Sequence, residues 1–217
     1  MPASGDEQTI EYDLCSPGDA DAMARLLGEV FSRRDPPALA VGLTASEFEA
    51  FARLYCPKAA VEGLTVVARD AGTRELLGVV LTEDAASGPP DGMAQLSPKF
   101  EPIFDILGRL DAAYRGDRTV RPGELLHLFL LGVAESAAGR GVAQQLVSTC
   151  LEHGARRGYR LAVTEATNTT SQHLFRKLGF TERVRQSYLH HRFAGQAVFT
   201  SIAEQGGPAL MDRSLVA

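Results

Sequence analysis

The stretch that decides the fold runs from Gly123 to Phe180 and reads GELLHLFLLGVAESAAGRGVAQQLVSTCLEHGARRGYRLAVTEATNTTSQHLFRKLGF. It begins as an apolar strand, continues through a turn of small residues at 138–143, and then shows helical spacing of apolar side chains. A glycine-rich turn from a strand into a helix leaves several backbone N–H groups unpaired at the positive end of the helix dipole. Because phosphate binds such groups, this stretch predicts a ligand that carries phosphate.

Length and composition favour one globular domain. The chain has 217 residues, of which 45% are hydrophobic and 23% charged, which excludes wholesale disorder. No internal repeat or linker divides it, so we expect a single mixed α/β domain over residues 1–217. The net charge of −5 argues against nucleic acid as the main partner, because neutralising phosphates needs a face rich in Lys and Arg.

The cysteines and the apolar runs favour a reducing compartment such as the cytoplasm. The three cysteines are odd in number and widely spaced, which predicts neither a disulfide framework nor a zinc site, and we expect no metal. The polar, acidic N-terminus has no secretory h-region. The longest apolar run, residues 125–134, is too short to span a membrane. We therefore expect no membrane association and a cytoplasmic location.

Apolar periodicity predicts the elements on either side of the turn. Strands are expected at 7–14, 64–69, 75–82, from 125 up to the turn, and 159–164, with helices at 17–31, 44–56, 100–114, 142–157 and 171–178. A terminal hairpin is expected from 184–193 and 196–202, with a short strand near Leu210. Segment 83–99 is expected to be a flexible loop, either covering a site or forming a plain surface insertion.

Local signals fix some of these boundaries. Asp35-Pro36-Pro37 ends the first helix because proline cannot continue it. Thr44 followed by Glu47 predicts a capping box at the start of the second helix. Gly158 is expected to stop the helix that follows the turn. The buried stripe of that helix is expected to consist of Val142, Leu146, Val147, Cys150, Leu151 and Ala155.

The turn differs from two well-known phosphate-binding patterns. The GxxxxGK[ST] pattern is absent, and the dinucleotide fingerprint GxGxxG is not completed after Gly141. On its local residues alone, the turn is compatible either with a phosphate-bearing ligand or with a tight structural turn.

The surrounding residues resemble the GCN5-related N-acetyltransferase (GNAT) family. The family's acetyl-CoA turn, [QR]-x-x-G-x-[GA], corresponds to Ala138-Gly139-Arg140-Gly141-Val142-Ala143, with Ala138 where relatives carry Gln or Arg. The second half of the family signature corresponds to Ala166–Phe180, an Asn-containing loop and short helix ending in Leu-Gly-Phe. The resemblance is strongest over 125–180, the expected acetyl-CoA-binding core, and it implies the family's fold, a twisted mixed sheet flanked by helices.

The resemblance also implies contacts with acetyl-CoA. The strand end would receive the pantetheine arm and the acetyl carbonyl, the turn amides would hold the pyrophosphate, and the loop after the next strand would contact the cofactor again. The matching positions are Leu131, Gly132 and Val133, then Ala138, Gly139, Arg140, Gly141, Val142, Ala143 and Gln144, and finally Asn168 and Ser171.

Two residues compete for the role of general base. The segment 31–37 looks similar to the arylalkylamine or dopamine N-acetyltransferase-like branch, where an acid before proline acts as base; Asp35 stands there. His127 is the alternative, on the strand face expected to be shared with Phe129, Leu131 and Val133. Each residue also has a purely structural interpretation: Asp35 could form the turn before proline, and His127 could be a partly buried, hydrogen-bonded strand residue.

The same branch implies that Ser171 donates a proton to the leaving thiolate. Phe175 stands where many relatives place a tyrosine acid, and it is expected in the core. The aromatic residues could line an amine pocket or form core: Phe31, Phe48, Phe51, Tyr55 and Phe104.

The expected activity is acetyl transfer from acetyl-CoA to a small-molecule primary amine, by direct attack in a ternary complex. Two alternatives are a CoA-binding sensor without catalysis, motivated by Ala138 and Phe175, and a protein-lysine acetyltransferase. A monomer and a homodimer are both compatible with the sequence.

Overall fold

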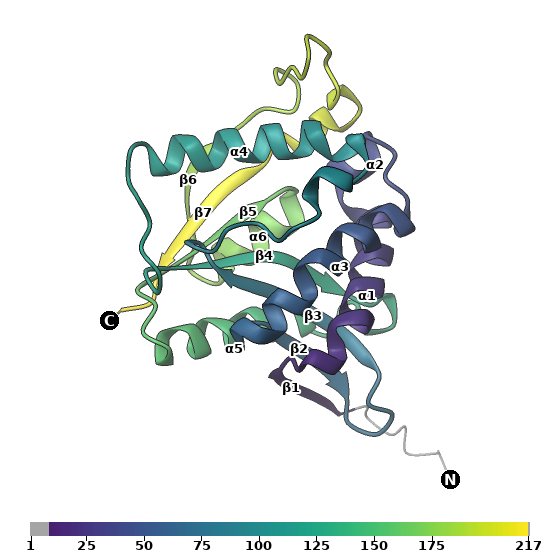
Figure 1. Ribbon diagram of the computed structural model, residues 1–217, viewed down its shortest axis with the longest axis vertical. Helices are drawn as coiled ribbons and strands as arrows, with labels where there is room; N and C mark the ends of the chain where they lie inside the picture. The colour runs from purple at the N-terminus through teal and green to yellow at the C-terminus, as the bar shows by residue number, and fades with distance from the viewer. Residues whose placement is uncertain (1–8, 217) are drawn as a thin grey trace.

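Seven runs of apolar and β-branched residues form the strands of one mixed sheet in the computed structural model, which describes residues 9–216 (Figure 1). The order across the sheet is β1-β2-β3-β4-β5-β7-β6. Only β4 and β5 run parallel; the other neighbours are antiparallel. The strands are β1 (Ile10–Leu14), β2 (Val66–Asp70), β3 (Leu76–Asp84), β4 (Leu125–Val133), β5 (Leu161–Ala166), β6 (Thr181–Arg185) and β7 (Ala209–Ser214).

The helices lie close to their predicted positions. They are α1 (Ala20–Arg34), α2 (Pro36–Ala40), α3 (Ala45–Glu62), α4 (Glu101–Arg115), α5 (Val142–Arg156) and α6 (Thr169–Lys177). The predicted capping box begins α3: the Thr44 side chain accepts from the Glu47 N–H, and the Glu47 carboxylate accepts from the Thr44 N–H at 2.8 Å. Asp35 ends α1 as expected, but Pro36 also starts the short α2, because proline suits the first turn of a helix.

The helices cover both faces of the sheet and bury separate cores. Helices α1 and α3 pack on one face in a cluster rich in phenylalanine, and α4 closes the same face over β5 and β7 (Figure 1). Helices α5 and α6 bury their apolar sides on the opposite face. The mixed α/β fold predicted from the sequence is therefore confirmed, with the turn and the Asn168 loop at the same end of the central strands.

The predicted terminal hairpin forms only at its tip, where Phe193 and Gln196 make an isolated antiparallel bridge; the strands expected on either side of it are absent from residues 186–208. After β6 the chain forms a long irregular connection that ends in a short 3-10 turn at Thr200–Gln205 (Figure 1). The apolar side chains that suggested strands, Tyr188 and Phe199, are instead buried against the α1–α3 core, where each is 0% exposed. The expected strand near Leu210 is β7, which inserts between β5 and β6 and pairs with both.

Two local expectations also need correction. Ala155 is exposed, and Gly154 completes the buried stripe of α5 because the helix crosses β4 there: a Cβ at Gly154 would lie 2.5 Å from Leu126 Cδ2. Segment 83–99 contributes its first two residues to β3 and contains two short 3-10 turns. Its end is held to α3, since Lys99 Nζ donates to Glu47 Oε2 at 2.9 Å.

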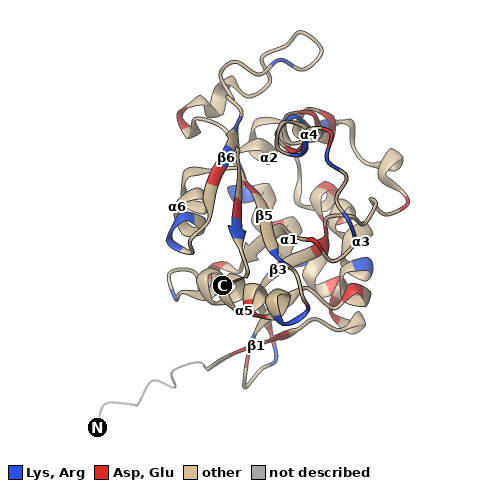
Figure 2. Ribbon diagram, turned by 90° about the vertical axis from the view of Figure 1, so that its left-hand side faces the viewer, with Lys and Arg blue, Asp and Glu red and all other residues tan. Residues whose placement is uncertain are grey.

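Basic and acidic residues are interspersed along the helices and strands, and neither sign dominates the view in Figure 2. Among residues 9–216, no helix combines the length and apolar character needed to cross a bilayer.

Candidate active site

The two parallel strands at the centre of the sheet separate along their length. Their pairing covers three residue pairs and ends at His127 opposite Val163, although β4 continues to Val133 and β5 to Ala166. Beyond that point the facing edges of β4 and β5, both fully described, form no ladder with each other. The strands thus bound a wedge whose backbone N–H and C=O groups can bind an extended ligand.

A bulge on β4 sets which of its side chains lie on each face of the sheet. Leu81 of β3 pairs with Leu130 and the next residue, Thr82, pairs with Leu128, so Phe129 is the extra residue on β4. The expectation that His127, Phe129, Leu131 and Val133 share one face is therefore wrong, because a bulge reverses the alternation. Phe129 packs with the α1–α3 core, whereas Leu131 and Val133 pack toward α5.

The predicted phosphate turn follows β4 after a 3-10 turn at Glu135–Ala137. Gly139 and Gly141 have φ of 74° and 77°, a conformation that favours glycine, and a Cβ on either would meet no atom within 4 Å. Gly141 caps α5 without a side-chain hydrogen bond, and no acidic residue lies in the first turn. The start of α5 thus has no side-chain cap and no acidic neighbour in its first turn, and the space beside the two glycines is open, which suits an anion site.

The residues around these glycines differ in what they expose. Val142 is 1% exposed and packs in the α5 core, so only its backbone faces the turn. Arg140 and Gln144 are exposed and line a groove with Tyr12 of β1. Ala138 is extended, with φ of −63° and ψ of 146°, and it carries the chain from the 3-10 turn to Gly139.

Asp35 is a buried carboxyl at the junction of α1 and α2. Its side chain is the N-cap of α2, where Oδ2 accepts from the Ala38 N–H at 3.1 Å. Its other oxygen, Oδ1, accepts from the Thr167 hydroxyl at 2.7 Å. Burial raises the pKa of Asp35 to about 6, against the lowering effect of those two hydrogen bonds. Near neutral pH this group is a carboxylate that can readily accept a proton.

Thr167 connects Asp35 to the loop after β5. It precedes Asn168, whose side chain accepts from the Ser171 N–H at 2.8 Å and so caps α6. The Ser171 hydroxyl completes the capping box and donates to the Asn168 carbonyl at 3.0 Å. Tyr188, fully buried in the connection from β6 to β7, donates its hydroxyl to the Thr167 carbonyl at 2.7 Å. Three predicted residues, Asp35, Asn168 and Ser171, are thus brought together.

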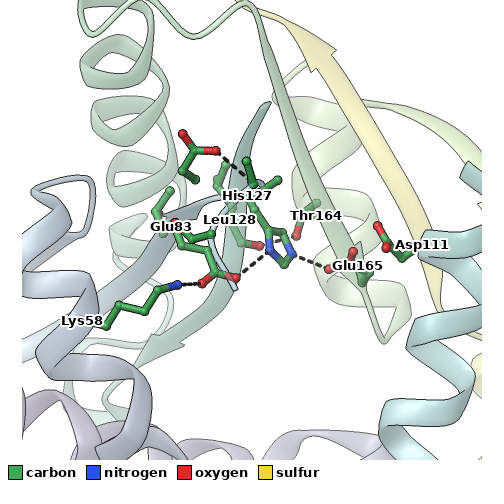
Figure 3. Close-up of polar contacts among 12 residues, drawn as sticks. Lys58, Glu83, Asp111, His127, Leu128, Thr164 and Glu165 are labelled. Carbon is green, nitrogen blue, oxygen red and sulfur yellow. Dashed lines mark hydrogen bonds and ion pairs between the residues drawn. The ribbon is translucent and has the colours of Figure 1, made fainter. Parts of the chain in front are cut away.

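His127 belongs to a different polar network, at the closed end of the wedge (Figure 3). Its Nε2 lies 2.7 Å from Glu165 Oε2 on β5, and its Nδ1 lies 3.2 Å from Glu83 Oε1 on β3. Burial acts against a charged ring, but the carboxylates of Glu165 and Glu83 outweigh it and raise the pKa of His127 to about 10. The ring is therefore an imidazolium at neutral pH. A general base must be unprotonated to accept a proton, so this ring does not suit that role.

An aromatic cluster lies between these two polar groups. Phe129 packs 5.4 Å from the His127 ring and 4.7 Å from Tyr55, measured between ring centroids. The cluster continues to Phe31, which stacks on Phe48 at 4.6 Å, four residues before Asp35. Phe48, Phe51 and Tyr55 are at most 7% exposed and belong to the core, while Phe31 and Phe104 are only partly buried. Phe175 is 3% exposed and packs on Phe180.

Sequence reasoning missed Thr167, Tyr188, Glu83 and Glu165. Thr167 is the only one with a local signal, its place beside Asn168; the others are joined to the site by contacts between distant segments. Within residues 9–216, the His, Cys, Asp and Glu side chains form no group of three suited to a metal ion.

Comparison with known proteins identifies the fold and the motif. Residues 58–180 match the model of the acetyltransferase (GNAT) family. The C-terminal condensation domain of Ebony, solved in complex with beta-alanyl-dopamine, has a TM-score of 0.86 at 14% identity, over 95% of this chain and 99% of that one.

Two insect acetyltransferases share the architecture. Arylalkylamine N-acetyltransferase 2 from Aedes aegypti gives a TM-score of 0.79 at 18% identity, covering 96% of this chain and all of that one, 100%. Polyamine N-acetyltransferase from Drosophila melanogaster, which catalyses the formation of N-acetylagmatine, gives a TM-score of 0.75 at 19% identity, covering 95% of this chain and 100% of that one. At these identities the likeness establishes the fold, and it confirms the resemblance that the sequence showed.

Proposed function

Because this chain belongs to the GNAT family of acetyltransferases, we propose that it transfers the acetyl group of acetyl-CoA to a small primary amine by direct attack in a ternary complex. The observation that carries the proposal is Asp35: a buried carboxyl with a pKa near 6 that accepts a hydrogen bond at 2.7 Å from Thr167, in the loop after β5.

The turn and the wedge suit the donor. The open space over Gly139 and Gly141, with the uncapped start of α5, offers several N–H groups to a pyrophosphate. The unpaired edge of β4 at Leu131–Val133 offers backbone groups to the amides of the pantetheine arm. Ala138 supplies no side-chain donor there, so the binding energy comes from the backbone cradle, with Arg140 at its rim.

Asp35 suits the role of base toward the acceptor. A primary ammonium must lose one proton before its nitrogen can attack the thioester carbon. That proton passes to the Asp35 carboxylate, directly or through water, and later to solvent. The C–N bond forms, and the C–S bond of the thioester breaks as the tetrahedral intermediate collapses. Ser171 at the start of α6 is the candidate donor of the proton that the CoA thiolate takes up, and the second proton lost by the attacking nitrogen, carried through water, restores the serine hydroxyl. The products are the N-acetylamine and CoA.

His127 is a weaker candidate for the base than Asp35. Its imidazolium would have to lose a proton that two carboxylates stabilise, which holds its pKa near 10. We therefore assign proton removal to Asp35 and treat His127 as part of the framework.

Small amines with an aromatic or cationic tail are the proposed acceptors. The partly buried rings of Phe31 and Phe104 adjoin the aromatic core on the face where Asp35 lies. The structural relatives named above act on arylalkylamines or form N-acetylagmatine, or hold beta-alanyl-dopamine.

Release of CoA thiol tests the proposal. We expect acetyl-CoA with at least one of dopamine, tyramine, tryptamine or agmatine to release thiol, with the intersecting initial-velocity lines of a ternary complex. Asp35→Asn should abolish most of this activity, whereas the exposed Asp91→Asn should not change it. Tight CoA binding without turnover on any amine would instead indicate a CoA-binding sensor, and turnover only on peptides would indicate a protein-lysine acetyltransferase.

The likeness to the Ebony domain favours a second candidate. Its bound beta-alanyl-dopamine is an amine joined to an aminoacyl group, which is larger than acetyl. Under this candidate the same acceptor site and Asp35 would work with a longer acyl thioester. Comparing kcat/KM for acetyl-CoA and beta-alanyl-CoA with one amine distinguishes the two candidates.

A further inference from the structure

Side chains join β4 and β5 at the narrow end of the wedge, where the backbone pairing of the two strands stops. Backbone pairing between β4 and β5 stops at His127 and Val163. Immediately beyond it, two side-chain contacts cross from one strand to the other: His127 Nε2 to Glu165 Oε2 at 2.7 Å, and the Thr164 hydroxyl to the Leu128 carbonyl at 2.9 Å. The separation of the strands is thus set by these two bridges at the point where the ladder ends.

The His127 bridge is anchored on three neighbouring strands and a helix. The ring lies between Glu165 of β5 and Glu83 of β3, and Glu83 also accepts from Lys58 Nζ of α3 at 2.6 Å. The side chains of His127, Glu83 and Glu165 are 14%, 12% and 12% exposed. A protonated ring donates from both nitrogens at once, which a shielded site makes stronger than in water.

Other charged groups lie near the row formed by Lys58, Glu83, His127 and Glu165, but none of them joins β4 to β5 in place of His127. Glu62 of α3 lies 3.4 Å from Lys58. Arg115 of α4 acts on Glu165 through its charge and is itself held by Asp111 at 2.5 Å. Both carboxylates of the row keep a lowered pKa despite burial, because the imidazolium lies beside them. The bridge therefore stays charged through the neutral range.

Strand β5 leads from this bridge to Asp35. Glu165 and Thr167 are two residues apart, so in an extended chain their side chains lie on one side. The first binds His127 and the second donates to Asp35 Oδ1 at 2.7 Å. A change in the position of β5 at Glu165 therefore moves the hydroxyl that holds the carboxyl of Asp35.

We propose that His127 is a positioning residue whose ring ties β5 to β4 where their pairing ends, and so fixes Thr167 against Asp35. The inference rests on the proposed function, since Asp35 acts as base there. His127 touches neither substrate in this account; it acts through Glu165 and β5.

Cutting the bridge from either end tests the inference. His127→Gln can donate to only one of the two carboxylates, and Glu165→Ala leaves the ring paired with Glu83. We expect both variants to raise the pKa of Asp35 by about half a unit or more, because the Thr167 hydrogen bond to the carboxylate weakens. We also expect kcat to fall about tenfold, as for a misplaced base, with the Kd for CoA within about twofold.

Two matched variants separate positioning from general damage. Glu165→Gln keeps an oxygen that accepts from Nε2–H, so kcat should stay within about threefold of wild type. His190→Gln removes an exposed histidine and should leave every parameter unchanged.

The readout is the 13C NMR titration of the Asp35 carboxyl together with steady-state kinetics. An unchanged Asp35 pKa and kcat in Glu165→Ala would overturn the inference, even if His127→Gln failed to fold. So would Glu165→Gln being as damaging as Glu165→Ala. Because the NMR titration needs no turnover, an inactive wild-type protein would refute the proposed function and still leave the bridge measured.

Discussion

Replacing Asp35 with Asn should stabilise the protein while it removes the base. Burial raises the pKa of Asp35 from 3.8 to about 6, so the folded state resists the charge that the unfolded chain carries freely. The charge then costs about 3 kcal/mol of stability at pH 7.5 and about 1.6 kcal/mol at pH 5. Asparagine has nearly the same shape, and its amide oxygen can keep one of the two hydrogen bonds to Asp35.

The sign follows from the direction of the pKa change. A group with a raised folded pKa favours the folded state below its unfolded pKa, and this advantage is lost as the pH rises through the folded value. Below about pH 3 both states are protonated, and Asp35→Asn should differ from wild type only by the lost hydrogen bond. Its stability relative to wild type should rise by about 1.4 kcal/mol from pH 5 to pH 7.5; the lost hydrogen bond lowers the stability of the variant equally at both pH values and does not change this rise.

Urea unfolding at pH 5 and pH 7.5 measures this difference. The exposed Asp91→Asn is the control and should show the same pH dependence as wild type. A stability difference between Asp35→Asn and wild type that is constant with pH would refute the reasoning, since it would mean that the Asp35 carboxyl is not destabilised by burial.

Three further substitutions probe the turn, the packing of α5 and the base. Gly141→Ala forces a side chain to a φ of 77°, which should cost about 1 kcal/mol, and its methyl group should weaken CoA binding about tenfold by calorimetry. Gly154→Ala places a methyl group against Leu126 and should lower stability by about 1–3 kcal/mol in urea unfolding. Thr167→Val removes a donor from Asp35 and should move the acidic limb of the kcat/KM profile to higher pH.

Each of these has a matched control. Gly158→Ala carries the same strain at a φ of 91° beyond the C-terminal end of α5, and should lose stability without losing CoA affinity. Gly108→Ala meets open space on α4 and should stabilise by up to about 1 kcal/mol. Thr167→Ser keeps the hydroxyl and should keep the wild-type profile. Equal effects in a variant and its control would contradict the corresponding explanation.

The parts of the fold that could be predicted from sequence are those with local causes. Gly139 and Gly141 are required by backbone conformation, and the Thr44 capping box is complete within four residues. The motif halves at 138–143 and 166–180 were sufficient to identify the family, which the comparisons confirm.

What could not be predicted depends on distant partners. The insertion of β7 between β5 and β6 decides that Tyr188 lies in a buried connection rather than a strand, and nothing near Tyr188 encodes it. The bulge at Phe129 is visible only in the register with β3. Because side chains alternate, one extra residue was enough to reverse the predicted face of Leu131 and Val133.

The same limit applies to the candidate site. The proline after Asp35 marked that residue, but its hydrogen bond to Thr167 joins positions 132 apart in the sequence, where the junction of α1 and α2 meets the loop after β5. His127 was a reasonable base by residue type alone. Its two carboxylate partners, 44 and 38 positions distant, make it a stable cation instead.

The pH dependence of kcat/KM tests the central claim most directly. Wild type should show an acidic limb with an apparent pKa near 6, the value for buried Asp35. Asp35→Asn should lose that limb together with about 10²–10⁴-fold of the rate, while still binding CoA. Full activity in Asp35→Asn, with the same limb near pH 6, would contradict the assignment of Asp35 as the base.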